Sequence, residues 1–138
     1  MQVTNEKCAL CLRFPEDRDH LFSRCEKSKE VRRVVNSWWN VLPSNCDSFE
    51  QLLDDDDLVH HKDRRLAIKG MVKIAYMWAI CIGRNDALFN NVSFNPLITA
   101  NVIQRYVYHW LRNRSSLGSS IDWFIWLCNP KNFVPPSG

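Results

Sequence analysis

The chain has 138 residues, 46% of them hydrophobic and 24% charged, with a formal net charge of +3. This length predicts a single domain with a packed core, and the composition argues against a disordered, collagen-like or linker protein. No stretch approaches roughly 18 uncharged apolar residues, and residues 1–7 hold no apolar signal core, so we expect neither a membrane span nor secretion. We therefore expect a nuclear or cytoplasmic protein, whose six cysteines are metal ligands or buried side chains and do not form disulfides.

The N-terminal segment, residues 1–27, has too few apolar side chains to build a conventional core. It contains the spacing C-x2-C-x8-H-x4-C, formed by Cys8, Cys11, His20 and Cys25. Two thiolates separated by two residues can bind one tetrahedral ion from a single tight turn, and a second pair completes the coordination. The pattern predicts one structural Zn²⁺ per chain, with no open position for catalysis.

His20 and Cys25 are five residues apart, which on an ideal α-helix separates them by about 140° around the axis. They would then face different directions. We therefore expect His20 or Cys25 to lie at the frayed end of a helical turn over residues 19–24.

The rest of the chain has the apolar spacing of helices and almost no period-two alternation. A helix is expected over residues 28–39, with Ser28 as its N-cap and Pro43 ending it, and a short capped helix over 48–53 leads into the acidic run 54–57. The longest helix should span about 63–89, and another should span 95–114, with Asn95 as N-cap and Pro96 in its first turn. A turn over 115–120 precedes a last short helix or extended segment over 121–128, and 131–138 is expected to be disordered.

These elements predict a mainly α fold, in which a zinc-knuckle segment over 1–27 packs on a small bundle of about four helices. The bundle, residues 28–130, continues the same domain. The apolar arc of the 63–89 helix is wide enough that we expect it to be packed on two sides. Cys81 lies on that arc and is expected in the core, and Cys46 and Cys128 are also expected to be packing residues.

Charge is uneven along the chain, since residues 1–57 carry a net charge of −4 and residues 58–138 a net charge of +7. The basic half could attract a polyanion. On the 95–114 helix, Arg105, Tyr108 and Arg112 are three and four residues apart and should share a face that binds RNA or DNA, with Arg114 nearby. Phe14 or Phe22 of the knuckle could stack on unpaired bases. A solvated polar surface, with Phe22 in the core, explains the same residues equally well.

The segment from Cys8 to Cys25, with its His20-Leu21-Phe22 sequence, resembles the zinc-binding domain that follows the polymerase in plant LINE-type (non-LTR) reverse transcriptases. Members of that family follow the last cysteine with a helix that carries Trp, here residues 28–39. The stretches 78–89, with Arg84-Asn85, and 121–130 resemble theirs as well, so the likeness covers nearly the whole chain. Arg32 stands where the family usually has Trp, and Cys81 where it often has a second Trp; both departures concern the packing of the helices.

The resemblance implies a structural zinc and an accessory, non-catalytic role in which the domain grips RNA or target DNA beside the polymerase. No enzyme activity and no small-molecule substrate are expected, because the acidic run 54–57 lacks the flanking strands of a polymerase metal site. The alternative is a protein-interaction module that docks the polymerase domain or self-associates. It rests on tryptophans in excess of what a small core needs: Trp38, Trp39, Trp123 and Trp126.

Overall fold

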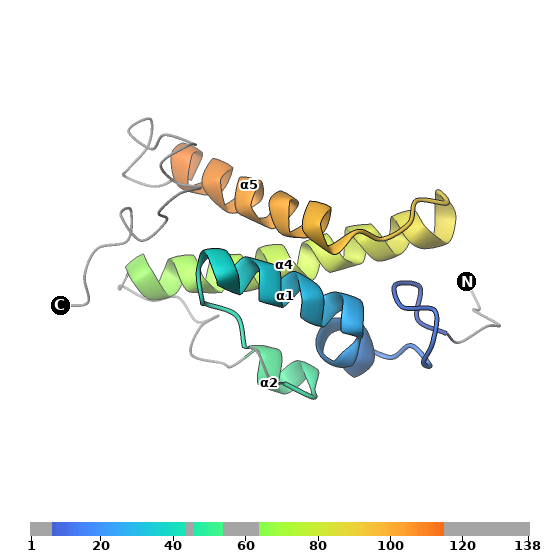
Figure 1. The fold of residues 1–138 in the computed structure, drawn as a ribbon. Helices are drawn as coiled ribbons and strands as arrows, with labels where there is room; N and C mark the ends of the chain where they lie inside the picture. Colours follow the sequence, from blue (N-terminus) through green and yellow to red (C-terminus); the bar gives the residue numbers. More distant parts are fainter. Residues whose placement is uncertain (1–6, 44–45, 54–63, 115–138) are drawn as a thin grey trace.

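The structure, a computed structural model, describes residues 7–43, 46–53 and 64–114, and every regular element in that part is a helix (Figure 1). The mainly α fold expected from the sequence, with a knuckle-like segment near its N-terminus, is confirmed. The elements are the π-helix η1 (His20–Arg24), followed by the α-helices α1 (Glu26–Trp38), α2 (Phe49–Leu53), α4 (Arg64–Phe89) and α5 (Pro96–Arg114).

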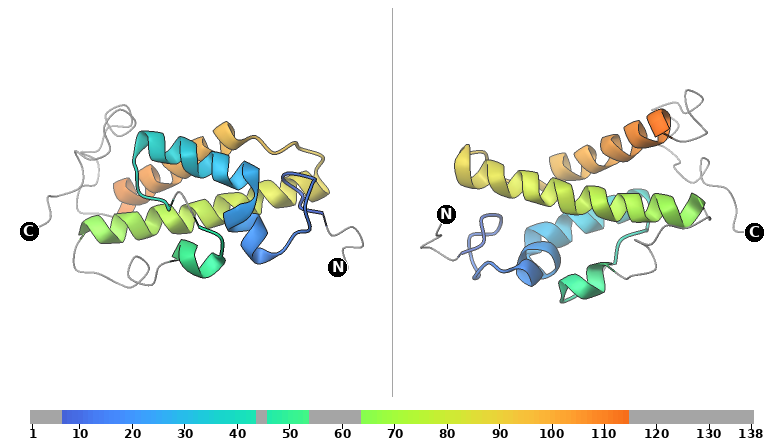
Figure 2. Two further views of the ribbon diagram at one scale, coloured as in Figure 1. Left: turned by 60° about the horizontal axis from the view of Figure 1, so that its bottom comes forward. Right: turned by 180° about the vertical axis from the view of Figure 1, so that it is seen from behind.

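α5 packs against both of the other long helices. α5 runs back along α4 in the opposite direction, and α1 packs against α5 (Figure 1). η1 contacts α1, α2 and α4, and with α2 it lies on the side of α4 away from α5 (Figure 2). The N-terminal loop leads directly into η1, so the knuckle segment is attached to one end of the bundle.

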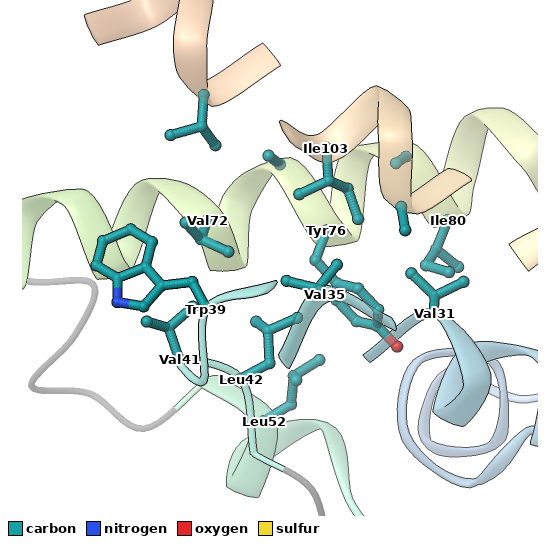
Figure 3. Close-up of a cluster of buried hydrophobic side chains, with 14 of the residues drawn as sticks. Val31, Val35, Trp39, Val41, Leu42, Leu52, Val72, Tyr76, Ile80 and Ile103 are labelled. Atoms are coloured by element: carbon teal, nitrogen blue, oxygen red, sulfur yellow. The ribbon is translucent and has the colours of Figure 1, made fainter. Parts of the chain in front are cut away.

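One apolar core joins all the helices (Figure 3). Val31 and Val35 of α1 meet Tyr76 of α4 and Ile103 of α5, all fully buried. The segment that follows α1 turns back and adds further side chains to this cluster, and α2 contributes one. These are Trp39, Val41, Leu42 and Leu52.

α1 begins two residues earlier than the sequence predicts. Cys25 occupies the N-cap position, and the Lys29 amide donates the first helical hydrogen bond to the Cys25 carbonyl at 2.9 Å. The prediction that Ser28 caps this helix is therefore wrong. Ser28 is buried in the first turn, where its hydroxyl donates to the carbonyl of Leu21 in η1.

α1 also ends earlier than expected, at Trp38, before Pro43 is reached. The side chain of Asn36 turns the chain back on itself. Its Oδ1 accepts hydrogen bonds from the amides of Val41 (3.2 Å) and Leu42 (2.9 Å), and its Nδ2 donates to the Leu42 carbonyl (2.9 Å). An amide side chain, rather than a proline, ends the helix.

The other two capping predictions are confirmed. The Ser48 hydroxyl accepts a hydrogen bond from the Gln51 amide at 3.2 Å at the start of α2. Asn95 Oδ1 accepts from the amides of Leu97 (2.9 Å) and Ile98 (3.3 Å) at the start of α5. In both cases a short polar side chain satisfies amides that the helix itself leaves without partners.

α4 contacts α5 and η1, yet part of its apolar arc faces outward. Val72, Ala75 and Ala79 are buried as expected, whereas Ile82 is 43% exposed and Cys81 is exposed. The prediction that Cys81 belongs to the core is wrong, because the described neighbours of α4 pack on its other faces. Cys46, in contrast, is buried.

The acidic run 54–57 and the segments 115–120, 121–128 and 131–138 lie outside the described residues, as do Trp123, Trp126 and Cys128. Within the residues that the structure describes, no helix is both long enough and apolar enough to cross a membrane.

The connection between α4 and α5 folds against a glycine of α4. A Cβ atom on Gly83 would lie 2.5 Å from Cε1 of Phe94, a half-buried side chain that packs on the core. The absence of a side chain at Gly83 therefore lets the Phe94 ring approach the helix backbone.

We expect Gly83→Ala to destabilise the protein by about 1–3 kcal/mol, because the new methyl group must displace the Phe94 ring. In an open helical position the same change would stabilise the helix by up to about 1 kcal/mol. Adding Phe94→Ala removes the clash, so the double variant should lose less stability than the two single losses combined. Urea unfolding of the four proteins measures this coupling, and strictly additive losses would contradict the contact.

Candidate metal centre

A tight turn presents the first two cysteines. The Cys8 amide donates to the Phe14 carbonyl at 2.8 Å, and the Leu12 amide donates to the Cys8 carbonyl at 2.8 Å. Leu12 has φ 61°, in the left-handed region, and this value lets the chain reverse directly after Cys11. The reversal places both sulfur atoms on one side of the loop.

A π-helix presents the other two ligands. The Cys25 amide donates to the His20 carbonyl at 2.7 Å, so that hydrogen bond joins residues five apart, as a π-helix requires. His20 begins η1 and Cys25 follows its last residue. The wider turn of a π-helix brings the two side chains to the same side, which an α-helical turn would not do. Each of the two ligands lies at an end of η1. The sequence predicted this position for one of them.

The four side chains converge on one point. Their ligand atoms all lie within 4.8 Å of one another. The Sγ atoms of Cys8 and Cys25 are 3.8 Å apart, and Cys11 Sγ is 3.4 Å from His20 Nε2. Cys8, His20 and Cys25 are buried and Cys11 is half-buried. The four residues predicted as ligands therefore lie close enough to bind a metal ion.

The thiols of this cluster differ in acidity. A hydrogen bond from the Cys8 thiol lowers the pKa of Cys25, and the same hydrogen bond, together with burial, raises the pKa of Cys8. Of these two thiols, Cys25 therefore ionises before Cys8. Since metal ligation requires thiolates, a cation that binds here must release the Cys8 proton, and acid opposes binding.

Two acidic residues fix the ligand-bearing segments. Asp17 Oδ1 accepts a hydrogen bond from the His20 amide at 2.7 Å and so supports the start of η1. Glu16 accepts from the Ala9 amide at 3.1 Å, inside the cysteine turn, and from Arg84 of α4 at 2.7 Å. The Glu16 and Arg84 side chains are only 17% and 26% exposed, so their ion pair is partly desolvated. This ion pair links the knuckle to α4 of the bundle.

The carbonyl end of η1 is held by a buried arginine. Arg32 of α1 is 1% exposed. Its Nη1 donates to the Phe22 carbonyl (2.7 Å) and to the Tyr76 hydroxyl (2.8 Å), and its Nη2 donates to the Ser23 carbonyl (2.7 Å). Burial raises the pKa of Tyr76 to about 12, so its hydroxyl stays protonated and donates to the Phe22 carbonyl at 2.7 Å. We call Arg32 and Tyr76 the arginine clamp.

The clamp and Ser28 supply hydrogen bonds to carbonyls of η1. A helix leaves its last carbonyls without partners inside the helix. Here three successive carbonyls, of Leu21, Phe22 and Ser23, accept from side chains of α1 and α4. The sequence showed Arg32 only as a departure from an expected Trp. Arg32 lies one residue after Val31 and three before Val35, on the apolar side of α1. This position is the signal that could have identified the arginine as buried.

The residues predicted to contact nucleic acid do not all share one exposed surface. Arg105 and Arg112 are exposed on α5, but Tyr108 is only 5% exposed, and its hydroxyl accepts a hydrogen bond from Arg112 Nη1 at 2.8 Å. Tyr108 therefore lies beside Arg112, as the spacing predicts, but its ring is buried rather than exposed with the two arginines. The Arg114 side chain lies outside the described part.

The two phenylalanines of the knuckle differ. Phe14 is 50% exposed, lies beside the His20 ring (5.8 Å between centroids) and lines a hollow of about 380 Å³ together with Arg24. Phe22 is half-buried and packs against Phe49 of α2, with ring centroids 5.3 Å apart. Of the two candidates for base stacking, only Phe14 presents a ring to solvent.

Comparisons of the chain with protein-family models, with curated proteins and with solved structures find no match.

We expect Tyr76→Phe to weaken the metal centre through the arginine clamp. Losing the hydroxyl leaves one N–H of the buried Arg32 guanidinium without a partner, while the Phe22 carbonyl keeps its hydrogen bond from Arg32. We expect a cost of about 1–3 kcal/mol in the free energy of unfolding. Phe22 belongs to the same π-helix as His20, so the change should also disturb the position of that ligand. Metal affinity should fall by about tenfold, as it does when residues that hydrogen-bond to the ligands of a metal are replaced.

Titration against a competing chelator measures the affinity, and urea unfolding of the same samples measures the stability. Tyr106→Phe is the matched control, since this tyrosine of α5 is 39% exposed and its loss should change neither quantity. Unchanged metal affinity in destabilised Tyr76→Phe would show that the clamp serves the bundle alone.

Proposed function

We propose that this chain is a non-catalytic zinc-binding domain of a LINE-type reverse transcriptase, and that it helps to bind RNA or target DNA beside the polymerase. The observation that carries the proposal is the convergence of Cys8, Cys11, His20 and Cys25. In the sequence the same four residues form the most specific part of the resemblance to that family.

Two of the ligand distances are close to those expected around tetrahedral zinc. Tetrahedral Zn²⁺ with Zn–S bonds of about 2.3 Å separates two sulfur ligands by about 3.8 Å, and a sulfur from an imidazole nitrogen by about 3.6 Å. The corresponding distances are 3.8 Å between Cys8 and Cys25 and 3.4 Å between Cys11 and His20. Three sulfurs and one nitrogen are a typical ligand set for structural zinc, and with four protein ligands the ion has no open position for catalysis.

Charge supports nucleic acid as the partner. Residues 64–114 include eight Lys or Arg and one Asp or Glu. Arg105 and Arg112 lie two turns apart on α5 and are both exposed, so both can contact phosphates of one backbone. Phe14, with Arg13 against its ring at 5.9 Å, offers a second contact, in which an unpaired base stacks beside the metal centre.

The alternative of a tryptophan-rich docking module rests on four tryptophans, of which the structure describes Trp38 and Trp39. Trp39 is 5% exposed and Trp38 is half-buried against it, with the rings edge to face at 6.1 Å. Both rings therefore pack at the end of α1 and present little surface to a partner.

We expect one zinc per chain, measured by elemental analysis of protein purified without chelator. Cys11→Ala removes a ligand and should abolish stoichiometric zinc, and a strong chelator should unfold the N-terminal segment, because metal binding supplies a large share of its folding free energy. Cys81→Ala is the matched control, because this cysteine is exposed on α4, outside the cluster. Full zinc occupancy in Cys11→Ala would refute the assignment of the site.

We expect the zinc-loaded protein to bind RNA or single-stranded DNA with an affinity that falls steeply with salt. Arg105→Ala and Arg112→Ala should each weaken binding and reduce the slope of log affinity against log salt by about 1. Arg33→Ala carries the same charge change on α1 and should leave the slope unchanged. Fluorescence anisotropy with labelled oligonucleotides measures this, and no binding at low salt with zinc present would refute the nucleic-acid function.

A further inference from the structure

An apolar surface extends over the outer side of α4 and the adjoining edge of α5. Ile74, Trp78 and Ile82 are spaced four residues apart along α4 and are 44%, 46% and 43% exposed. The ring of Tyr106 in α5 lies against Trp78, with centroids 5.1 Å apart, and Val102 lies one helical turn before it. We call these five residues the α4–α5 apolar face.

The five residues of this face include no charged side chain. Seen from behind, α4 lies in front of the other described helices, so none of them covers its outer side (Figure 2). The residues that share the outer side with Trp78 include Cys81 and Asn85, both exposed and neither charged. Isoleucines and an exposed Trp along one helix, without a cation among them, suit an apolar polypeptide segment better than a phosphate backbone.

The chain itself contains such a segment. Residues 121–128 read Ile-Asp-Trp-Phe-Ile-Trp-Leu-Cys, and seven of these eight are apolar. Burying two Trp, one Phe and two Ile side chains releases several kcal/mol, at about 25 cal/mol for each Å² removed from water. Packing on an apolar surface of similar size would remove these side chains from water.

We propose that the α4–α5 apolar face is the docking site of residues 121–128 of the same chain. The proposal does not depend on zinc or on nucleic acid.

The length of the connection permits this docking. α5 ends at Arg114, eight residues beyond Tyr106, which is about 12 Å along the helix axis. Residues 115–120 span up to about 20 Å when extended. The segment can therefore turn back from the end of α5 and reach Tyr106 and Trp78 without strain.

Charge complements the contact. Asp122 is the only charged residue of the segment, and Arg105, exposed on α5, is next in sequence to Tyr106. A second copy of the chain would have to bring its own apolar face against this one, and each face adjoins an exposed arginine, Arg105. The chain's own segment avoids this repulsion.

A pair of cysteines allows a direct test on the full-length, zinc-loaded protein. Cys81 lies three residues after Trp78 on the exposed side of α4, and Cys128 ends the segment. At sub-micromolar concentration, a short bismaleimide should join Cys81 to Cys128 within one chain, as identified by intact mass and peptide mapping. Cross-linked dimers would overturn the proposal in favour of a second copy, and labelling of both thiols without a cross-link would overturn it in favour of a separate partner.

Variants in the face distinguish docking from chance proximity. Trp78→Ser should lower the yield of the cross-link by about tenfold, as expected for the loss of a central aromatic contact. Leu97→Ser is the matched control, because Leu97 is 65% exposed at the start of α5 and is not part of the face. Equal yields in the two variants would overturn the proposal.

A second measurement covers the case in which Trp78→Ser fails to fold, as judged by zinc content and circular dichroism. The double variant Trp123→Ser/Trp126→Ser leaves the described core intact and should uncover the face. The fluorescence of an apolar dye bound to the protein should then rise several-fold over the wild type. No increase would overturn the proposal.

Discussion

The fold depends on the guanidinium group of Arg32, which lies buried where η1, α1 and α4 meet. A buried charge is costly unless hydrogen bonds compensate it, and here two carbonyls of η1 and the hydroxyl of Tyr76 accept from it. These partners belong to elements far apart in the sequence. The hydrogen bonds that compensate the buried charge of Arg32 therefore also hold η1, which carries His20, against α1 and α4.

Two links consequently join the knuckle to the bundle. The cysteine turn has little apolar surface, yet it is joined to α4 by the Glu16–Arg84 ion pair, and η1 is joined to α1 and α4 by the arginine clamp. Both links place a charged group in a partly or fully desolvated position, where its hydrogen bonds are stronger than at the surface. The contacts with the bundle thus help to orient two of the four ligands, His20 and Cys25.

Much of this architecture could be predicted from the sequence, because helix periodicity and capping residues are local signals. The bounds of α4 and α5, the caps Ser48 and Asn95, and the grouping of the four ligands are of this kind. Exposure could not be predicted in the same way. Cys81 lies on an apolar arc and Tyr108 lies between two arginines, yet the first is exposed and the second buried, because the neighbouring helices decide which side of a helix is covered.

The π-turn of η1 has a consequence for the length of the chain between its ligands. An α-helical turn would align a histidine and a cysteine four residues apart, whereas this turn aligns residues five apart. The segment therefore holds one more residue than an α-helical version of the same site needs. Spacing and helix type must change together: a relative that lost one residue between His20 and Cys25 could keep its four ligands in place only by tightening the turn into an α-helix.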